Sequence, residues 1–243
     1  MTEPRVRIHE SPEDLAREAA RDFAERAGAA VAERGRFAVA FAGGSTPEAT
    51  YRVLARDYAD RDFWRSTYAF FGDERSVPPE DEDSNYRMAR EALLDHVEVA
   101  GVYRMKGELT PEMAAAEYER DLQGFFGAAP VFDLVLLGIG SDGHTASLFP
   151  GTPALDVTDR RVVANPVKKL STERITLTAP VINAARAVEF LVAGESKAEA
   201  VSEILEGGDE PSEYPSKMIQ PDNGELIWRL DTAAAGAMRQ PPG

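Results

Sequence analysis

The stretch FDLVLLGIGSDGHTASLFPG, residues 132–151, runs from an apolar strand into a loop that contains glycines, one aspartate and one histidine. The chain has three histidines, and His144 is the one in this loop. Two interpretations compete for the stretch. It is either a dinucleotide-binding fingerprint or a catalytic loop, and the rest of the chain has to decide between them.

Around this stretch the chain alternates between strand-like and helical segments without a long linker. Helices are expected at 12–33, from Pro47, after Ser84, at 111–126, near Pro180, at 196–205 and in the Ala-rich C-terminal segment. Apolar strands are expected between them, notably at 37–42, 66–71, 132–140, 160–167, 174–178, 187–194 and 225–231. Strands that are apolar on both faces and alternate with helices favour a parallel sheet with helices on both sides. We therefore expect an α/β, Rossmann-like layered fold with a mostly parallel sheet, formed by residues 1–243 as a single domain.

Composition limits the class of protein. Of the 243 residues, 43% are hydrophobic and 28% are charged, which is ordinary for a globular protein. The longest apolar runs are too short to cross a bilayer, and the first ten residues lack the apolar core of a signal peptide. A cytoplasmic protein without a membrane partner is expected. The absence of cysteine excludes disulfides, thiolate catalysis and cysteine-bound metals.

The formal net charge of −15 would repel nucleic acid over most of the surface, so we expect no nucleic-acid partner. Solubility, or adaptation to a salty cytoplasm, explains such acidity without any binding role. An anionic ligand would still need a local cluster of cations. We expect a monomer or a weak homo-oligomer.

The first candidate loop is AGGSTPE, residues 42–48, between a predicted strand and a predicted helix. Gly43 and Gly44 would let backbone N–H groups approach an anion, Ser45 and Thr46 add hydroxyls, and a helix N-terminus favours negative charge. A plain strand-to-helix turn explains the same pattern. No Gly-Lys-Ser/Thr follows, so ATP or GTP chemistry is not indicated.

The second candidate loop, FFGDERSVP, carries charged residues directly after an apolar strand. A surface loop is the simple explanation. The functional one gives Arg75 the stabilisation of negative charge and Asp73 proton transfer or orientation.

The third loop is the opening stretch. Gly138, Gly140 and Gly143 match G-x-G-x-x-G, but prolines interrupt the chain soon afterwards, where a dinucleotide site needs a long helix. Catalysis is favoured instead, because a histidine at a strand end, two residues from Asp142, has a side chain suited to proton transfer near neutral pH.

Cations gather later in the chain. Three of the five lysines, Lys168, Lys169 and Lys197, fall within 30 residues, with Arg174 among them. Lys197 is predicted in the first turn of a helix, where the helix dipole slightly disfavours it, so a role facing a ligand is plausible beside simple solvation. No G-x-S-x-G, H-E-x-x-H or EF-hand pattern is present, so we expect neither a covalent serine mechanism nor a metal.

Five blocks in order resemble the 6-phosphogluconolactonase family: AFAGGSTPEATYRVL, FFGDERSVPPEDEDSNYRMARE, FDLVLLGIGSDGHTASLFPG, NPVKKLSTERITLTAPVINAARAVEFLVAGESKAEAV and GELIWRLD. The resemblance covers residues 37–231. It implies a fold related to glucosamine-6-phosphate deaminase and ribose-5-phosphate isomerase. It also implies hydrolysis of 6-phospho-D-glucono-1,5-lactone to 6-phosphogluconate in the oxidative pentose phosphate pathway, without metal or organic cofactor.

By this resemblance His144 is the base that activates water, Arg75 lies beside the substrate, and a sugar-phosphate site is formed by Gly43, Gly44, Ser45, Thr46, Arg174 and Lys197. Asp142 is expected to orient the imidazole. One departure is YPSKMIQP near Pro215, where many relatives have small residues. Lys217 there either joins the anion site or is simply exposed.

Two rivals remain. Aminosugar-phosphate deaminase-isomerases share the glycine turn and the Asp-Gly-His loop, but an acid usually follows their histidine, and HTASLFPG contains none. A non-catalytic sugar-phosphate sensor would carry a DNA-binding segment and often lacks the histidine. This chain has His144 and no basic helical extension.

Overall fold

The computed structural model describes residues 4–208 and 210–239, and a parallel sheet organises them. Its seven strands lie in the order β1-β10-β9-β6-β2-β3-β5, with every neighbouring pair parallel. The strands are β1 (Arg5–His9), β2 (Phe37–Phe41), β3 (Thr67–Phe71), β5 (Gly101–Val102), β6 (Leu134–Leu137), β9 (Ala187–Val192) and β10 (Glu225–Asp231). The expected α/β class is confirmed.

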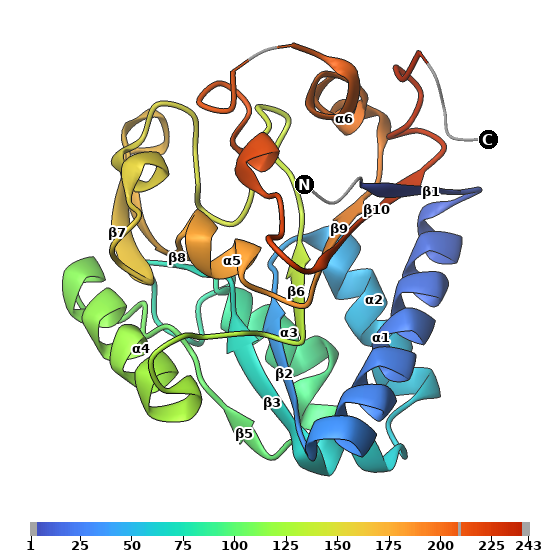
Figure 1. Ribbon diagram of the computed structural model, residues 1–243, viewed down its shortest axis with the longest axis vertical. Coiled ribbons are helices and arrows are strands. Elements are labelled where there is room, and N and C mark those ends of the chain that lie inside the picture. Colours follow the sequence, from blue (N-terminus) through green and yellow to red (C-terminus); the bar gives the residue numbers. More distant parts are fainter. Residues whose placement is uncertain (1–3, 209, 240–243) are drawn as a thin grey trace.

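Alternate residues of the central strands enter two separate apolar cores, one on each face of the sheet. Phe37, Val39 and Phe41 pack with helices α1 (Pro12–Arg34), α2 (Ser45–Asp57) and α3 (Asn85–Ala92). Ala38 and Ala40 face the other core, with helices α4 (Pro111–Phe126), α5 (Ala179–Asn183) and α6 (Ala198–Glu206). Figure 1 shows α1 and α2 on one side of the sheet and α4 on the other. Because side chains alternate along a strand, a central strand buried on both faces is mostly apolar along its whole length.

The local signals in the sequence explain where the helices begin. The Ser11 side chain accepts a hydrogen bond from the Asp14 N–H at 3.1 Å, and Pro12 occupies the first turn of α1. That helix ends at Gly35, whose φ of 72° suits glycine. Ser84 caps α3 in the same way, as expected. Thr110 precedes Pro111 at the start of α4.

A second, antiparallel sheet covers one end of the first. Its order is β4-β8-β7, and the strands are β4 (Asp73–Arg75), β7 (Val162–Val167) and β8 (Thr172–Leu177). The prediction that residues 73–75 form a polar loop was wrong. They pair with β8, with Arg75 opposite Arg174, because the chain after β3 turns onto a neighbouring strand that offers free backbone groups.

Other boundaries differ from expectation. β1 and β5 were not predicted, since one is half polar and the other is two residues long. The segment 232–237 forms turns, not the expected Ala-rich helix, and it begins where Asp231 accepts the Ala234 N–H at 2.7 Å. The helix expected at 196–205 starts as a 3₁₀ turn, Glu195–Lys197, and continues as α6.

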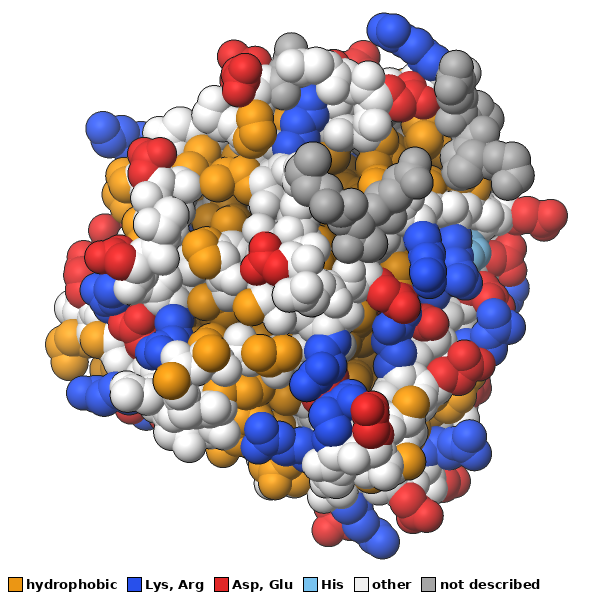
Figure 2. Space-filling model, in the orientation of Figure 1, with side chains coloured by type: hydrophobic (Ala, Val, Ile, Leu, Met, Phe, Trp, Pro, Cys, Tyr) orange, Lys and Arg blue, Asp and Glu red, His pale blue; other side chains and the backbone are white. Residues whose placement is uncertain are grey.

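Charged side chains cover much of the surface. Figure 2 shows Lys and Arg interspersed with Asp and Glu around the rim of one face. Within residues 4–208 and 210–239, no helix is both long enough and apolar enough to cross a membrane.

Candidate active site

A cavity of about 340 Å³ lies where the carboxyl ends of β2, β6 and β9 meet the small antiparallel sheet. Open α/β sheets bind ligands at this edge, because the loops that follow several strands converge there. The walls come from the three candidate loops and from the later segment that carries the cations, and they include Gly43, Asp73, His144, Arg174 and Lys197. Residues that are far apart in the sequence therefore face one space.

The glycine turn after β2 forms one wall. Gly44 has a φ of 101°, which a residue with a side chain rarely adopts, and α2 begins at Ser45. A Cβ at Gly43 would lie 1.9 Å from Oδ1 of Asn85, so only glycine fits there. The turn thus brings glycine main chain, Ser45 and Thr46 to the cavity at the start of a helix, where an anion is favoured.

The loop after β6 places His144 and Asp142 in contact. Nδ1 of His144 lies 2.6 Å from Oδ1 of Asp142, and the loop is closed by hydrogen bonds between Gly140 and its neighbours His144 and Gly143. A Cβ at Gly140 would lie 2.1 Å from Nδ1 of His144. The glycine of this motif therefore makes room for the imidazole, rather than for a dinucleotide.

The imidazole is held on its other side by Phe149, whose ring stacks on it with centroids 4.0 Å apart. Burial lowers the pKa of His144 from 6.5 to about 4, with Asp73 acting in the opposite direction and the cations Lys197, Arg174 and Arg75 adding to the decrease. The imidazole is thus neutral at pH 7 and can accept a proton.

Asp73 is buried beside the imidazole and is fixed by two donors. Ser147 Oγ donates to Oδ2 at 2.6 Å, and Asn85 Nδ2 donates to Oδ1 at 3.1 Å. Asn85 is held in turn by Glu74, whose carboxylate accepts the backbone N–H groups at the start of α3. The carboxylate of Asp73 is therefore held in one position at the cavity wall.

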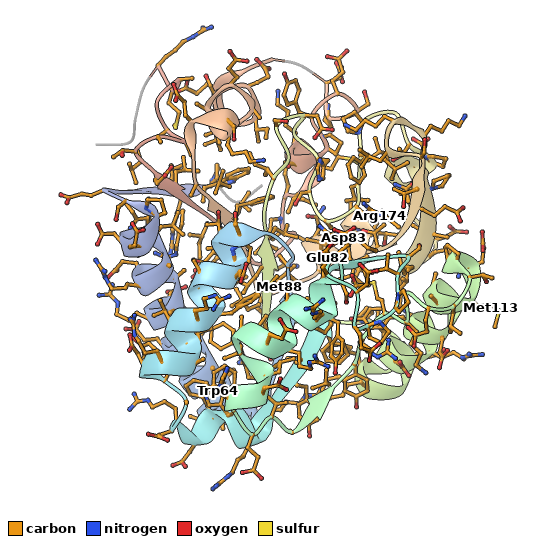
Figure 3. All side chains as sticks on the ribbon, turned by 180° about the vertical axis from the view of Figure 1, so that it is seen from behind. Trp64, Glu82, Asp83, Met88, Met113 and Arg174 are labelled. Carbon is orange, nitrogen blue, oxygen red and sulfur yellow. The ribbon has the colours of Figure 1, made fainter. Side chains whose placement is uncertain are left out.

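Three cations, Arg75, Arg174 and Lys197, also line the cavity. Arg75 and Arg174 are register partners on β4 and β8, and burial followed by the charge of Arg75 lowers the pKa of Arg174. Burial also lowers the pKa of Lys197. Figure 3 shows Arg174 with Asp83 nearby, and the Arg75 guanidinium donates to the backbone carbonyl of Asp83. Adjacent positive charges of this kind repel each other, and a bound anion would remove the repulsion.

Three other lysines, Lys168, Lys169 and Lys217, do not line the cavity. Lys217 donates to Oε1 of Glu203 at 3.1 Å and to the carbonyl of Gly207. Lys168 is exposed. Lys169 forms an ion pair with Asp142.

Sequence reasoning assigned no role to Asn85, Ser147, Phe149 or Glu74, although Glu74 stands in the charged trio after β3. These residues act through contacts between distant segments, and the only local hint was the cap signal beside Asn85. Among the described residues, no three His, Asp or Glu side chains are grouped as they would be around a metal ion.

Together these features define an α/β protein in which one cavity joins a neutral imidazole to a cluster of cations. Residues 10–228 match the family model described as glucosamine-6-phosphate isomerases/6-phosphogluconolactonase, and the chain belongs to this family of enzymes. It is 47% identical over 208 residues to the 6-phosphogluconolactonase of Synechocystis sp., covering 83% of this chain and 84% of that one.

Solved structures are similar to this chain as well. The 6-phosphogluconolactonase from Trypanosoma cruzi is 30% identical, with a TM-score of 0.87 and 99% of each chain covered. A monomeric glucosamine-6-phosphate deaminase has a TM-score of 0.80 over 96% of this chain and 99% of its own, at 22% identity. The second likeness extends to the fold alone, and it confirms the expected relationship of the fold to the deaminases.

Proposed function

We propose that this chain hydrolyses 6-phospho-D-glucono-1,5-lactone to 6-phosphogluconate, in the oxidative pentose phosphate pathway of the cytoplasm, without a metal ion. One observation carries the proposal. A neutral imidazole paired with a carboxylate shares a cavity of about 340 Å³ with two arginines and a lysine. The lactonase relatives support the choice of substrate.

The substrate binds through its phosphate. Gly43 to Thr46 offer backbone N–H groups and hydroxyls at the start of α2, and Arg174 and Lys197 supply the positive charge. This anchor holds the lactone carbonyl in register with His144, so that binding energy from the phosphate contributes to the rate.

His144 then acts as a general base. A carboxylate only accepts hydrogen bonds at neutral pH, so Asp142 keeps the proton of the imidazole on Nδ1 and leaves the Nε2 lone pair free. Nε2 removes a proton from water as the water oxygen attacks C1. The ester C–O bond breaks as the imidazolium returns the proton to the leaving ring oxygen, which gives the carboxylic acid and an alcohol.

Two further groups assist. Arg75, or a backbone N–H of the glycine turn, stabilises the oxyanion that forms at the carbonyl oxygen. Asp73 lies close enough to raise the proton affinity of His144 and to offset part of the effect of the cations. Bound phosphate would cancel more of their charge, which makes the imidazole a stronger base once substrate is present.

The rival deaminase activity is disfavoured by the residues that follow the imidazole. The position beside His144 is occupied by the Phe149 ring, and no carboxylate lies between His144 and Gly151 to assist ring opening. Glucosamine 6-phosphate should therefore release no ammonia.

The test generates the lactone in situ from glucose 6-phosphate and compares wild type with His144→Gln and His96→Gln. His96 is exposed and is the matched control. We expect His144→Gln to lose roughly 10²- to 10⁴-fold in kcat and the control to keep full activity. Wild-type hydrolysis no faster than the spontaneous reaction would remove the function. Full activity of His144→Gln would remove the mechanism.

A further inference from the structure

The tip of the β7–β8 hairpin touches the catalytic loop. Val167 and Thr172 are register partners, and the turn between them contains a 3₁₀ segment, Lys168–Leu170, closed by Ser171 with a φ of 49°. From this tip the Lys169 ammonium group donates to Oδ2 of Asp142. Two elements separated by more than twenty residues are thus joined at the proposed base.

The two oxygens of Asp142 are divided between two partners. Oδ1 contacts Nδ1 of His144 at 2.6 Å, and Oδ2 contacts Lys169. Lys169 Nζ also lies 5.3 Å from the centroid of the Phe149 ring, the ring that stacks on His144. The carboxylate and the aromatic ring that hold the imidazole therefore hold the lysine as well.

We propose that Lys169 is a positioning residue, whose ammonium group fixes the hairpin tip against the catalytic loop and shares the charge of Asp142 with His144. This inference rests on the proposed function in one respect, because it takes His144 to be the base. The position of the hairpin tip also affects the cavity through the next residue, Leu170. Leu170 lines the cavity although about half of it is exposed, so the position of the tip also shapes the entrance for substrate.

The effect of Lys169 on the pKa of His144 follows from the charges around the imidazole. These are the carboxylates Asp73 and Asp142 and the cations Arg75, Lys169, Arg174 and Lys197. A cation bound to Asp142 reduces the stabilisation that this carboxylate gives to a protonated imidazole. Removing Lys169 leaves the full charge of Asp142 to His144, so the pKa of His144 should rise.

Substitution of Lys169 should change the free energy of unfolding only slightly. The Lys169 side chain is 52% exposed, and ion pairs of this kind contribute little to the free energy of unfolding. A change seen on substituting Lys169 would therefore report on the site rather than on the fold. Lys168, exposed on the same turn, gives a matched control.

The experiment compares Lys169→Met, Lys169→Arg and Lys168→Met. The titration of His144 is followed by NMR on ¹³C-labelled histidine, assigned with His144→Gln, and KM and the pH profile of kcat/KM are measured alongside. We expect Lys169→Met to raise the pKa of His144 by about half a unit or more and to raise KM several-fold. Lys169→Arg and Lys168→Met should behave as wild type.

A Lys169→Met protein that matches Lys168→Met in both the titration and KM would overturn the inference. If Lys169→Met loses its folded circular dichroism spectrum, Lys169→Gln takes its place with the same expectations. The titration needs no turnover. A shifted pKa in a protein without lactonase activity would therefore support the role of Lys169 while removing the proposed function, and an unshifted pKa in an active enzyme would do the reverse.

Discussion

Nδ1 of His144 lies 2.6 Å from Oδ1 of Asp142, with only Gly143 between the two residues in the chain. The contact depends on a turn in which Gly143 adopts a φ of 72°. The local turn brings the imidazole and the carboxylate together, and two distant segments hold the turn in place, because Lys169 donates to Asp142 and Ser216 donates to the carbonyl of Gly143.

Asp142→Asn tests that pairing. An asparagine keeps the shape but loses the charge that stabilises an imidazolium, and its amide can present a donor to Nδ1. We expect kcat to fall roughly 10- to 100-fold, less than for loss of the base itself. Steady-state lactone hydrolysis measures it. Asp156→Asn, an exposed change in the following loop, serves as control and should be silent. Equal activity of the two variants would show that Asp142 has no part in the reaction.

Arg174→Met tests the phosphate anchor. The variant removes a partly buried cation that faces the cavity, and a hydrogen bond to a charged group contributes about 1.5–3 kcal/mol. We expect KM to rise about tenfold or more, with a smaller change in kcat. Arg120→Met, on the exposed surface of α4, is the control. An unchanged KM would place the phosphate away from Arg174.

The decline of kcat/KM at acid pH should follow the protonation of His144. Because burial lowers its pKa to about 4, the free enzyme keeps a neutral imidazole well below pH 6.5, and kcat/KM should decline only as the pH approaches 4. Phosphate bound beside Arg174 and Lys197 would cancel part of the positive charge and raise this pKa. Histidine NMR with and without saturating inorganic phosphate measures the shift. The exposed His96 should not respond, and an equal shift of both residues would indicate a general salt effect.

Most of the sheet was predictable from sequence because its central strands are buried on both faces. β2, β6 and β9 are short apolar segments, and the ends of each were expected within about three residues. The edge strands β1 and β5 lack this signal. At the C-terminal end, alanine-rich composition favoured a helix, and a tertiary contact decided otherwise, since Asp231 binds both the turn at Ala234 and the backbone of Gly194.

The candidate site was predictable where a loop follows a strand directly. The glycine turn and the loop of His144 met this condition, and the structure brings them to one cavity with Arg174 and Lys197. Partners that come from other elements could not be predicted. Asn85 reaches Asp73 from α3, and Lys169 reaches Asp142 from a hairpin tip, and neither contact leaves a pattern in the local sequence.

Stability should depend on a buried ion pair whose residues do not line this cavity. Arg229 on β10 and Glu189 on β9 form it with almost no exposure, and Asp22 of α1 lies 3.5 Å from Arg229. Burial raises the pKa of Glu189, and the guanidinium opposes that rise. Arg229→Met would leave the carboxylate buried without its partner, so it should lower the free energy of unfolding by about 3–5 kcal/mol.

Urea unfolding of three variants tests this expectation. Arg7→Met is an exposed control on the neighbouring strand β1 and should change stability by about 0.5 kcal/mol or less. The double variant Glu189→Met with Arg229→Met replaces the pair by apolar side chains and should regain most of the loss. We propose that residues 1–243 form one domain, so each variant should unfold in a single transition. Because neither residue of the pair lines the cavity, lactone hydrolysis by the folded protein should be unchanged. An Arg229→Met protein as stable as Arg7→Met would mean that Glu189 is neutral or solvated in the native state.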